Sequence, residues 1–120
     1  MTYDDTNIFA KMIRGQIPCD AVYENEFVLA FRDIEPKAKV HILVVPKNAY
    51  VSIDDFGDRA TPQEAHAFLQ AISHIARAQD LEEMGYRIIM NHKTYAGQQV
   101  FHFHAHILGG EPLGPMISLG

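Results

Sequence analysis

Near the C-terminus, apolar and polar side chains alternate up to a pair of glycines. The segment from Phe101 to Gly110 reads FHFHAHILGG, with its three histidines at alternate positions. Because successive side chains on a β-strand point to opposite faces, an extended segment places the three imidazoles on one face, roughly 6.6 Å apart. Phe103, Ala105 and Ile107 form the other face, which is apolar and can pack on a core. We therefore expect a strand that carries a row of titratable groups.

Four further segments have the apolar pattern of β-strands. They are Ala21–Glu24, Phe27–Arg32, Val40–Val45 and Tyr86–Asn91. The turn-forming pair Asn25 and Glu26 separates the first two, which predicts a hairpin. Val40–Val45 is the run richest in β-branched residues, so we expect it in the middle of the sheet.

Three segments have helical spacing or capping residues. Asn7 can cap a short helix over Ile8–Ile13, and Ser52–Phe56 can form one helical turn. The strongest local signal is Thr61–Glu64, a capping box with proline at the first helical position. Apolar residues at helical spacing then predict one long amphipathic helix to about Leu81.

Together these elements predict an α+β fold: a five-stranded, mainly antiparallel sheet with one long helix and a short N-terminal helix. A single domain is expected over residues 1–120, with a loop from His92 to Gln99 and an irregular tail at 111–120. A chain of 120 residues can bury a core without disulfides or metals.

Composition and charge exclude several classes of protein. The chain is 48% apolar and 21% charged, with a formal net charge of -5, so it lacks the basic stripe that binds a nucleic-acid polymer. A small phosphate ligand needs only a few donors and stays possible. The single Cys19 fits a reducing, cytoplasmic location. The polar start is unlike a signal peptide, and the apolar runs are too short to span a membrane.

The row His102, His104 and His106 allows three interpretations. A solvated strand face rarely uses the same titratable residue three times, which disfavours a purely structural role. A metal site is possible because imidazole binds zinc, copper, iron and nickel, and Glu111 follows, although the glycines before it should end the strand. The third interpretation is nucleophilic catalysis on phosphorus by a neutral imidazole held in one tautomer. The residues alone leave metal binding and nucleophilic catalysis open.

If the row is catalytic, the middle histidine is the best placed nucleophile. The other histidines and the amide donors Gln98 and Gln99 can then hydrogen-bond the phosphoryl charge and the leaving group. Gly97 allows the backbone to come close to a phosphate.

The segment His102–Leu108 resembles the histidine triad superfamily, because it matches the signature His-φ-His-φ-His-φ-φ, in which φ is apolar. The chain is most similar to the Hint branch, the histidine triad nucleotide-binding proteins, over nearly its whole length. The stretches that carry this similarity are Ile8-Phe9, Ile17-Pro18, Phe31–Ile34, His41–Lys47, Ile89–Asn91, Gly97-Gln98 and Leu108–Met116.

The resemblance implies a purine nucleoside phosphoramidase without metal or other cofactor. Such an enzyme hydrolyses the P–N bond of AMP or GMP phosphoramidates, including aminoacyl types, through a nucleotidyl-histidine intermediate, and it binds purine mononucleotides. The resemblance also implies a homodimer, with the long helix and Tyr86–Asn91 at the contact. We expect the tail after Gly110 to pass near the partner's site and to influence substrate choice.

The resemblance also assigns roles to the histidines. His104 is the expected nucleophile. His102 is expected to donate to a phosphate oxygen and to orient His104 through its backbone carbonyl. His106 and His41 are expected to form a supporting relay.

Further positions match the substrate contacts of the family. Asn91 and Gln98 match contacts to the phosphate and the leaving group, and Asp33 matches the residue that binds the ribose hydroxyls. The apolar positions that match the slot for the base are Ile8, Phe9, Ile17, Phe31 and Ile34.

The chain departs in two ways from patterns within the family. Gln99 stands where some members have a serine that donates to phosphate, which leaves the preference for leaving groups open. Asn7 and Ala10 stand where some members have a Cys-x-x-Cys pair, so no structural zinc site is expected. The alternatives are a nucleotide-binding module with little turnover, a metal-dependent protein and, more distantly, the dinucleoside polyphosphate hydrolase branch. The remaining histidines, which we expect to be exposed, are His66, His74 and His92.

Overall fold

The structure is a computed structural model, and it describes residues 2–117. The strands are β1 (Ala21–Glu24), β2 (Val28–Arg32), β3 (Val40–Pro46), β4 (Tyr86–Ile89) and β5 (Ala105–Gly109). The helices are α1 (Ile8–Ile13), α2 (Ile53–Arg59), α3 (Pro62–Ala78) and α4 (Lys93–Ala96). The strands form one sheet in the order β1-β2-β3-β5-β4, and every neighbouring pair is antiparallel. The predicted α+β class and the five-stranded sheet are confirmed, with β3 in the centre.

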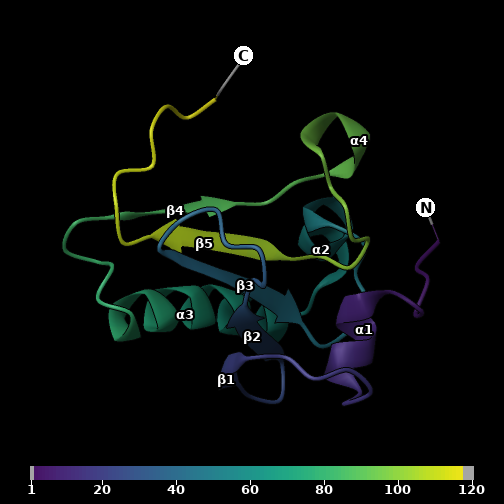
Figure 1. The fold of residues 1–120 in the computed structure, drawn as a ribbon. Helices are drawn as coiled ribbons and strands as arrows, with labels where there is room; N and C mark the ends of the chain where they lie inside the picture. Colours follow the sequence, from purple (N-terminus) through teal and green to yellow (C-terminus); the bar gives the residue numbers. More distant parts are fainter. Residues whose placement is uncertain (1, 118–120) are drawn as a thin grey trace.

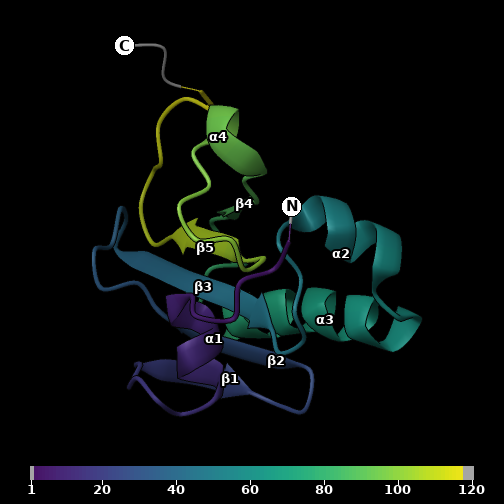
Figure 2. The same ribbon diagram turned by 90° about the vertical axis from the view of Figure 1, so that its right-hand side faces the viewer.

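Both faces of the central strands are covered. Figures 1 and 2 show α3 along one face of the sheet and α1 against the other. On β3, Ile42 and Val44 pack in the cluster under α3, while Leu43 and Val45 pack in the cluster that includes Phe9 of α1. Burial on both faces explains why this strand is almost continuously apolar in sequence.

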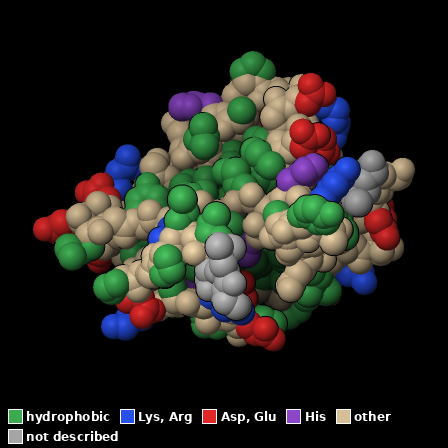
Figure 3. All heavy atoms as spheres, turned by 90° about the horizontal axis from the view of Figure 1, so that it is seen from above, with side chains coloured by type: hydrophobic (Ala, Val, Ile, Leu, Met, Phe, Trp, Pro, Cys, Tyr) green, Lys and Arg blue, Asp and Glu red, His purple; other side chains and the backbone are tan. Residues whose placement is uncertain are grey.

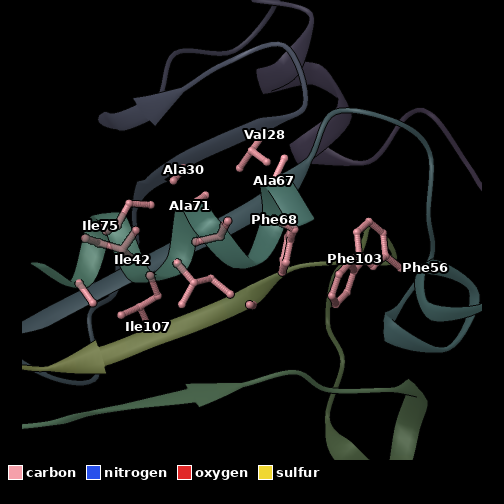
Figure 4. Packing of buried hydrophobic residues seen from close by; sticks show 14 of the residues in the cluster. Val28, Ala30, Ile42, Phe56, Ala67, Phe68, Ala71, Ile75, Phe103 and Ile107 are labelled. Carbon is pink, nitrogen blue, oxygen red and sulfur yellow. The ribbon is translucent and has the colours of Figure 1, made fainter. Parts of the chain in front are cut away.

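The larger cluster anchors the last strand. Ile107 of β5 packs there with residues of α3, and Phe103 stacks on Phe68 with ring centroids 4.9 Å apart (Figure 4). The alternation predicted for the histidine segment therefore holds, because Phe103, Ala105 and Ile107 all face this core. His104 and His106 consequently face the opposite side of the sheet.

The pairing of β5 begins later than predicted, at Ala105 rather than Phe101. The preceding residues use other partners: the Phe103 amide donates to the Tyr50 carbonyl at 2.7 Å, and the His102 ring bonds to the Pro46 carbonyl. His102 therefore lies on a bent segment before the strand, and the three histidines do not form one regular ladder.

Other element boundaries also differ from the predictions. The predicted single turn at 52–56 is a full helix, α2, because Ser52 and Asp55 form a capping box. Helix α3 ends at Ala78 rather than near Leu81, because Asp80 adopts a left-handed conformation with φ 59°. The segment predicted as a loop from His92 to Gln99 contains the short helix α4, and β4 ends before Asn91.

The tail has no helix or strand over residues 111–117, and its last three residues, 118–120, lie outside the part of the chain that the structure describes. Two carbonyls of the tail, those of Gly114 and Pro115, accept hydrogen bonds from the Arg87 guanidinium of β4. Among the helices built from residues 2–117, none has the length and apolar character needed to cross a membrane.

Candidate functional site

A cavity of about 530 Å³ lies on the face of the sheet opposite α3. Its lining comes from α1 and the loop before β1, from β2 and the loop after it, from β3, β4 and β5, and from the segment that includes α4. Its volume falls in the range of small-molecule sites. The predicted site residues that line it are Ile8, Phe9, Phe31, Asp33, Ile34, His41, Asn91, Gln99, His104 and His106.

His104 has one ring nitrogen fixed and the other open. Its Nδ1 lies 2.8 Å from the His102 carbonyl oxygen, and a carbonyl can only accept, so Nδ1 carries the hydrogen. Its Nε2 has no hydrogen-bond partner. Every fully buried side-chain nitrogen in residues 2–117 has one, so this Nε2 is not buried and reaches the cavity that His104 lines. Burial lowers the pKa of His104, while the hydrogen bond to His102 and the Asp33 charge act to raise it. At neutral pH the ring is therefore neutral, with a lone pair toward the cavity.

His102 does not face the cavity, contrary to the prediction that it donates to a phosphate oxygen. Its Nε2 donates to the Pro46 carbonyl at 2.7 Å, and its Nδ1 lies 2.6 Å from the Tyr3 hydroxyl. The side chain is fully buried, which lowers its pKa to about 4. With both ring nitrogens used, His102 can act on a substrate only through the carbonyl that holds His104.

His41 and His106 form a pair whose hydrogen bond has a defined direction. The backbone amide of Lys37 donates to His41 Nδ1 at 3.0 Å, so a neutral His41 carries its hydrogen on Nε2. That Nε2 lies 2.9 Å from His106 Nδ1 and 3.4 Å from a carboxylate oxygen of Asp33. His106 therefore accepts at Nδ1, and the hydrogen of its neutral form lies on Nε2, toward the cavity.

Burial also keeps this pair neutral. Burial, together with the neighbouring His104 and His41, lowers the pKa of His106 to about 4, although Asp33 acts to raise it. Burial likewise lowers the pKa of His41, against the opposing effect of Asp33. The pair can therefore gain a proton when a negative charge enters the cavity.

Asp33, His41 and His106 also form a group, within residues 2–117, whose ligand atoms lie close enough together to suit a metal ion. A metal at this point would need the lone pair of His41 Nε2. The Lys37 amide occupies the lone pair of Nδ1, which leaves the hydrogen on Nε2. The geometry therefore favours a hydrogen-bonded pair over a set of metal ligands.

Gln98 lies behind the cavity wall and not in it. Its amide nitrogen donates to the carbonyls of Val51 (2.6 Å) and Val100 (3.1 Å), and its amide oxygen accepts from the Lys93 amide (2.9 Å). These bonds use both hydrogens of the amide, so the predicted side-chain contact with the leaving group is not available. Gln99, the next residue, is exposed and lines the cavity.

The apolar wall of the cavity includes two exposed isoleucines. Ile34 is 92% exposed and Ile8 is 42% exposed, whereas Phe9 and Phe31 are buried and meet edge to face at 5.4 Å. Exposed apolar side chains at the wall of a cavity are suited to cover a flat ring. Ile17, which was predicted for the same slot, does not line the cavity.

Some residues at the site were missed by sequence reasoning. Met12 lines the cavity and follows Ile8 by one helical turn, a spacing that could have indicated it. Tyr3 and Lys37, which bond to triad residues or their neighbours, had no recognisable signal in the sequence. Cys19 also lines the cavity, and burial raises the pKa of its thiol.

The remaining histidines are exposed, as predicted. His74 packs against the ring of Tyr23, and His92 Nδ1 lies 2.7 Å from the hydroxyl of Ser52. His92 therefore helps to attach the start of α4 to the N-terminus of α2.

Comparisons with known proteins identify the family of this chain. The family model of the HIT domain matches residues 14–113. A protein of Escherichia coli K12 named purine nucleoside phosphoramidase is 41% identical over 114 residues, which are 95% of each chain. An uncharacterized HIT-like protein of Azospirillum brasilense is 50% identical over 119 residues, 99% of this chain and 98% of that protein.

Solved structures show the same fold. A HIT family hydrolase from Clostridium thermocellum superposes with a TM-score of 0.88 at 36% sequence identity. The match covers 96% of this chain and 99% of the other.

Proposed function

Because the chain belongs to the HIT family and shares the fold of HIT family hydrolases, we propose that it hydrolyses the P–N bond of purine nucleoside 5′-phosphoramidates. The observation that carries the proposal is the state of His104, whose Nε2 is open to the cavity while its Nδ1 is held by the His102 carbonyl. The name of the Escherichia coli relative supports the choice of substrate class.

In the proposed reaction, His104 Nε2 attacks the α-phosphorus and the bond to the amine breaks. The product is a nucleotidyl-histidine whose ring is positively charged, and the bond from Nδ1 to the His102 carbonyl stabilises that charge. The amine leaves with one added proton. Water then attacks the phosphorus, and His104 departs as a neutral ring. The proton that the water loses replaces the proton that left with the amine.

The pair of His41 and His106 can hold the transferred proton. Its rings are neutral while the cavity is empty, and an anionic phosphate next to His106 favours uptake of a proton. The Asp33 carboxylate, 3.4 Å from His41, stabilises the charged form. His106 can then give the proton to the leaving nitrogen or hydrogen-bond a phosphoryl oxygen.

The remaining lining residues fit a purine mononucleotide. The base would lie between Ile8, Phe9 and Ile34, and the ribose hydroxyls would donate to Asp33. Asn91 and Gln99 would contact the phosphate or the amine. Gln98 takes a supporting part in this proposal, because it holds the loop that carries Gln99.

We also propose that two copies pair through α3 and β4. The strand β4 is an edge of the sheet, so its outer backbone groups have no strand partner within residues 2–117. The face that carries α4, β4 and the tail gathers hydrophobic side chains in its middle, with charged side chains mainly around its margin (Figure 3). Analytical ultracentrifugation of the purified protein would measure its oligomeric state, and we expect the mass of two chains.

The decisive experiment is hydrolysis of adenosine 5′-phosphoramidate in the presence of EDTA. We expect turnover by the wild type and by His66→Ala, which alters an exposed histidine of α3, and none by His104→Ala. Mass spectrometry of acid-quenched protein should detect an adenylylated wild type. Binding of AMP without turnover would identify a nucleotide-binding module, and turnover abolished by EDTA would identify a metal-dependent protein.

A further inference from the structure

Tyr3 contacts the triad although it lies outside residues 14–113, the part that matches the HIT domain. Its hydroxyl is 2.6 Å from His102 Nδ1, and the two rings meet edge to face with centroids 5.6 Å apart. Figure 2 shows the N-terminal segment passing beside the start of β5 on its way to α1. The contact joins residues that are 99 positions apart in the chain.

The donor and acceptor of this contact can be assigned. The Asn7 side-chain oxygen accepts from the Ala10 amide, so its nitrogen is the group that donates to the Tyr3 hydroxyl, at 3.1 Å. The Tyr3 oxygen is then an acceptor from Asn7, and its own hydrogen goes to His102 Nδ1. Because His102 Nε2 donates to Pro46, each ring nitrogen of His102 has one suitable partner.

We propose that Tyr3 is a positioning residue for the reaction at His104, acting through His102; this rests on the proposed function. Tyr3 bonds to Nδ1 of the His102 ring, whose Nε2 hydrogen goes to Pro46, and so holds the ring in place. His102 in turn supplies the carbonyl that fixes His104 Nδ1 at 2.8 Å. The ring of His102 is fully buried, so no solvent replaces a lost partner without a rearrangement.

The contact is separate from the nucleotide contacts, although both involve α1. Asn7 caps α1 through its side-chain oxygen, and that cap does not need the Tyr3 hydroxyl. The ring of Phe9, on the same helix, meets the His104 ring edge to face, with the ring centroids 5.0 Å apart. Removal of the Tyr3 hydroxyl should therefore disturb His102 and His104 while α1 still presents its apolar residues to the base.

The test compares Tyr3→Phe with Tyr23→Phe. Tyr23 is a matched control, because its hydroxyl also accepts from an asparagine side chain (Asn25, 3.2 Å) and its ring also packs against a histidine (His74, 5.3 Å), but on β1 away from the cavity. For adenosine 5′-phosphoramidate, kcat of Tyr3→Phe should fall roughly tenfold, as expected when a buried acceptor loses its donor. The affinity for AMP should stay within about twofold, and Tyr23→Phe should match the wild type.

Nitrogen-15 NMR of the His102 ring tests the contact without turnover. In the wild type, Nδ1 should have the shift of an unprotonated nitrogen that accepts a hydrogen bond, and this shift should change in Tyr3→Phe. A wild-type kcat in Tyr3→Phe, or an unchanged His102 spectrum, would overturn the proposal. If the wild type does not hydrolyse the phosphoramidate, the proposed function fails, and the His102 spectra still decide whether Tyr3 holds His102.

Discussion

His41 Nε2 lies 2.9 Å from His106 Nδ1, and the backbone amide of Lys37 sets the direction of the hydrogen bond between them. Because that amide donates to His41, the hydrogen of His41 must point to His106. The hydrogen of His106 consequently lies on the nitrogen next to the cavity. A backbone group outside the triad therefore decides which nitrogen of the triad can meet a substrate.

Replacement of His41 should slow turnover. His41→Leu removes the donor to His106, so His106 can adopt either tautomer, and we expect kcat to fall about tenfold or more. His41→Gln keeps a side-chain donor and should retain part of the activity. Steady-state kinetics and AMP titration measure both effects, with His74→Gln as the control on the exposed side of α3. Equal rates for the Leu and Gln variants would contradict the role of this hydrogen bond.

Stability should fall between pH 7 and pH 5. The pKa values of His102 and His106 lie at about 4 in the folded chain, against about 6.5 when unfolded, so in this window the unfolded chain binds more protons. His102 alone should cost on the order of 2 kcal/mol of unfolding free energy at pH 5. Above about pH 7.5, where these histidines are neutral in the unfolded chain as well, they should have no further effect.

Urea unfolding at several pH values measures this loss. The carboxyl groups of Asp55 and Glu64 also have lowered pKa values, but their stabilising effect disappears only below about pH 4.5, outside the window. His106→Gln should show a shallower dependence than the wild type. An unfolding free energy that is the same at pH 5 and pH 7 would show that the buried histidines take up protons readily.

Substitution of Gln98 should affect stability, whereas substitution of the neighbouring Gln99 should affect substrate binding. Gln98→Ala leaves buried backbone groups without partners and should lower the free energy of unfolding by about 2 kcal/mol. Gln99→Ala should change stability by less than about 0.5 kcal/mol, because the side chain is exposed, but it should alter KM for phosphoramidates of different amines. Thermal unfolding and kinetics on both variants would test this division, and a stable Gln98→Ala would refute it.

Ile34 should contribute to binding and not to folding. Its side chain is 92% exposed at the cavity, so Ile34→Ser should leave stability within about 0.5 kcal/mol while AMP binds several-fold more weakly. Met84→Ser is a matched control, since Met84 is also 92% exposed but does not line the cavity. Calorimetric titration with AMP would measure the difference, and equal affinities for the two variants would remove Ile34 from the base slot.

Several features of the fold could be predicted because they depend on neighbouring residues. The alternation of Phe103, Ala105 and Ile107 with the histidines determines which side chains face the core, whatever the partners of the strand are. The capping box at Thr61 likewise acts within one helical turn and marks the start of α3. The family, too, was recognisable from the sequence, since its signature is a run of adjacent residues.

Tertiary structure decided which of the predicted residues line the cavity and which only support its wall. Gln98 and Gln99 are adjacent and chemically identical, yet one side chain turns inward to Val51 and the other lines the cavity. The partners that bond to the Nδ1 atoms of the histidines, Tyr3 for His102 and Lys37 for His41, are a side chain and a backbone amide in irregular segments. No periodic pattern marks such partners, because a hydrogen bond needs a distance and a direction that only the packed chain defines.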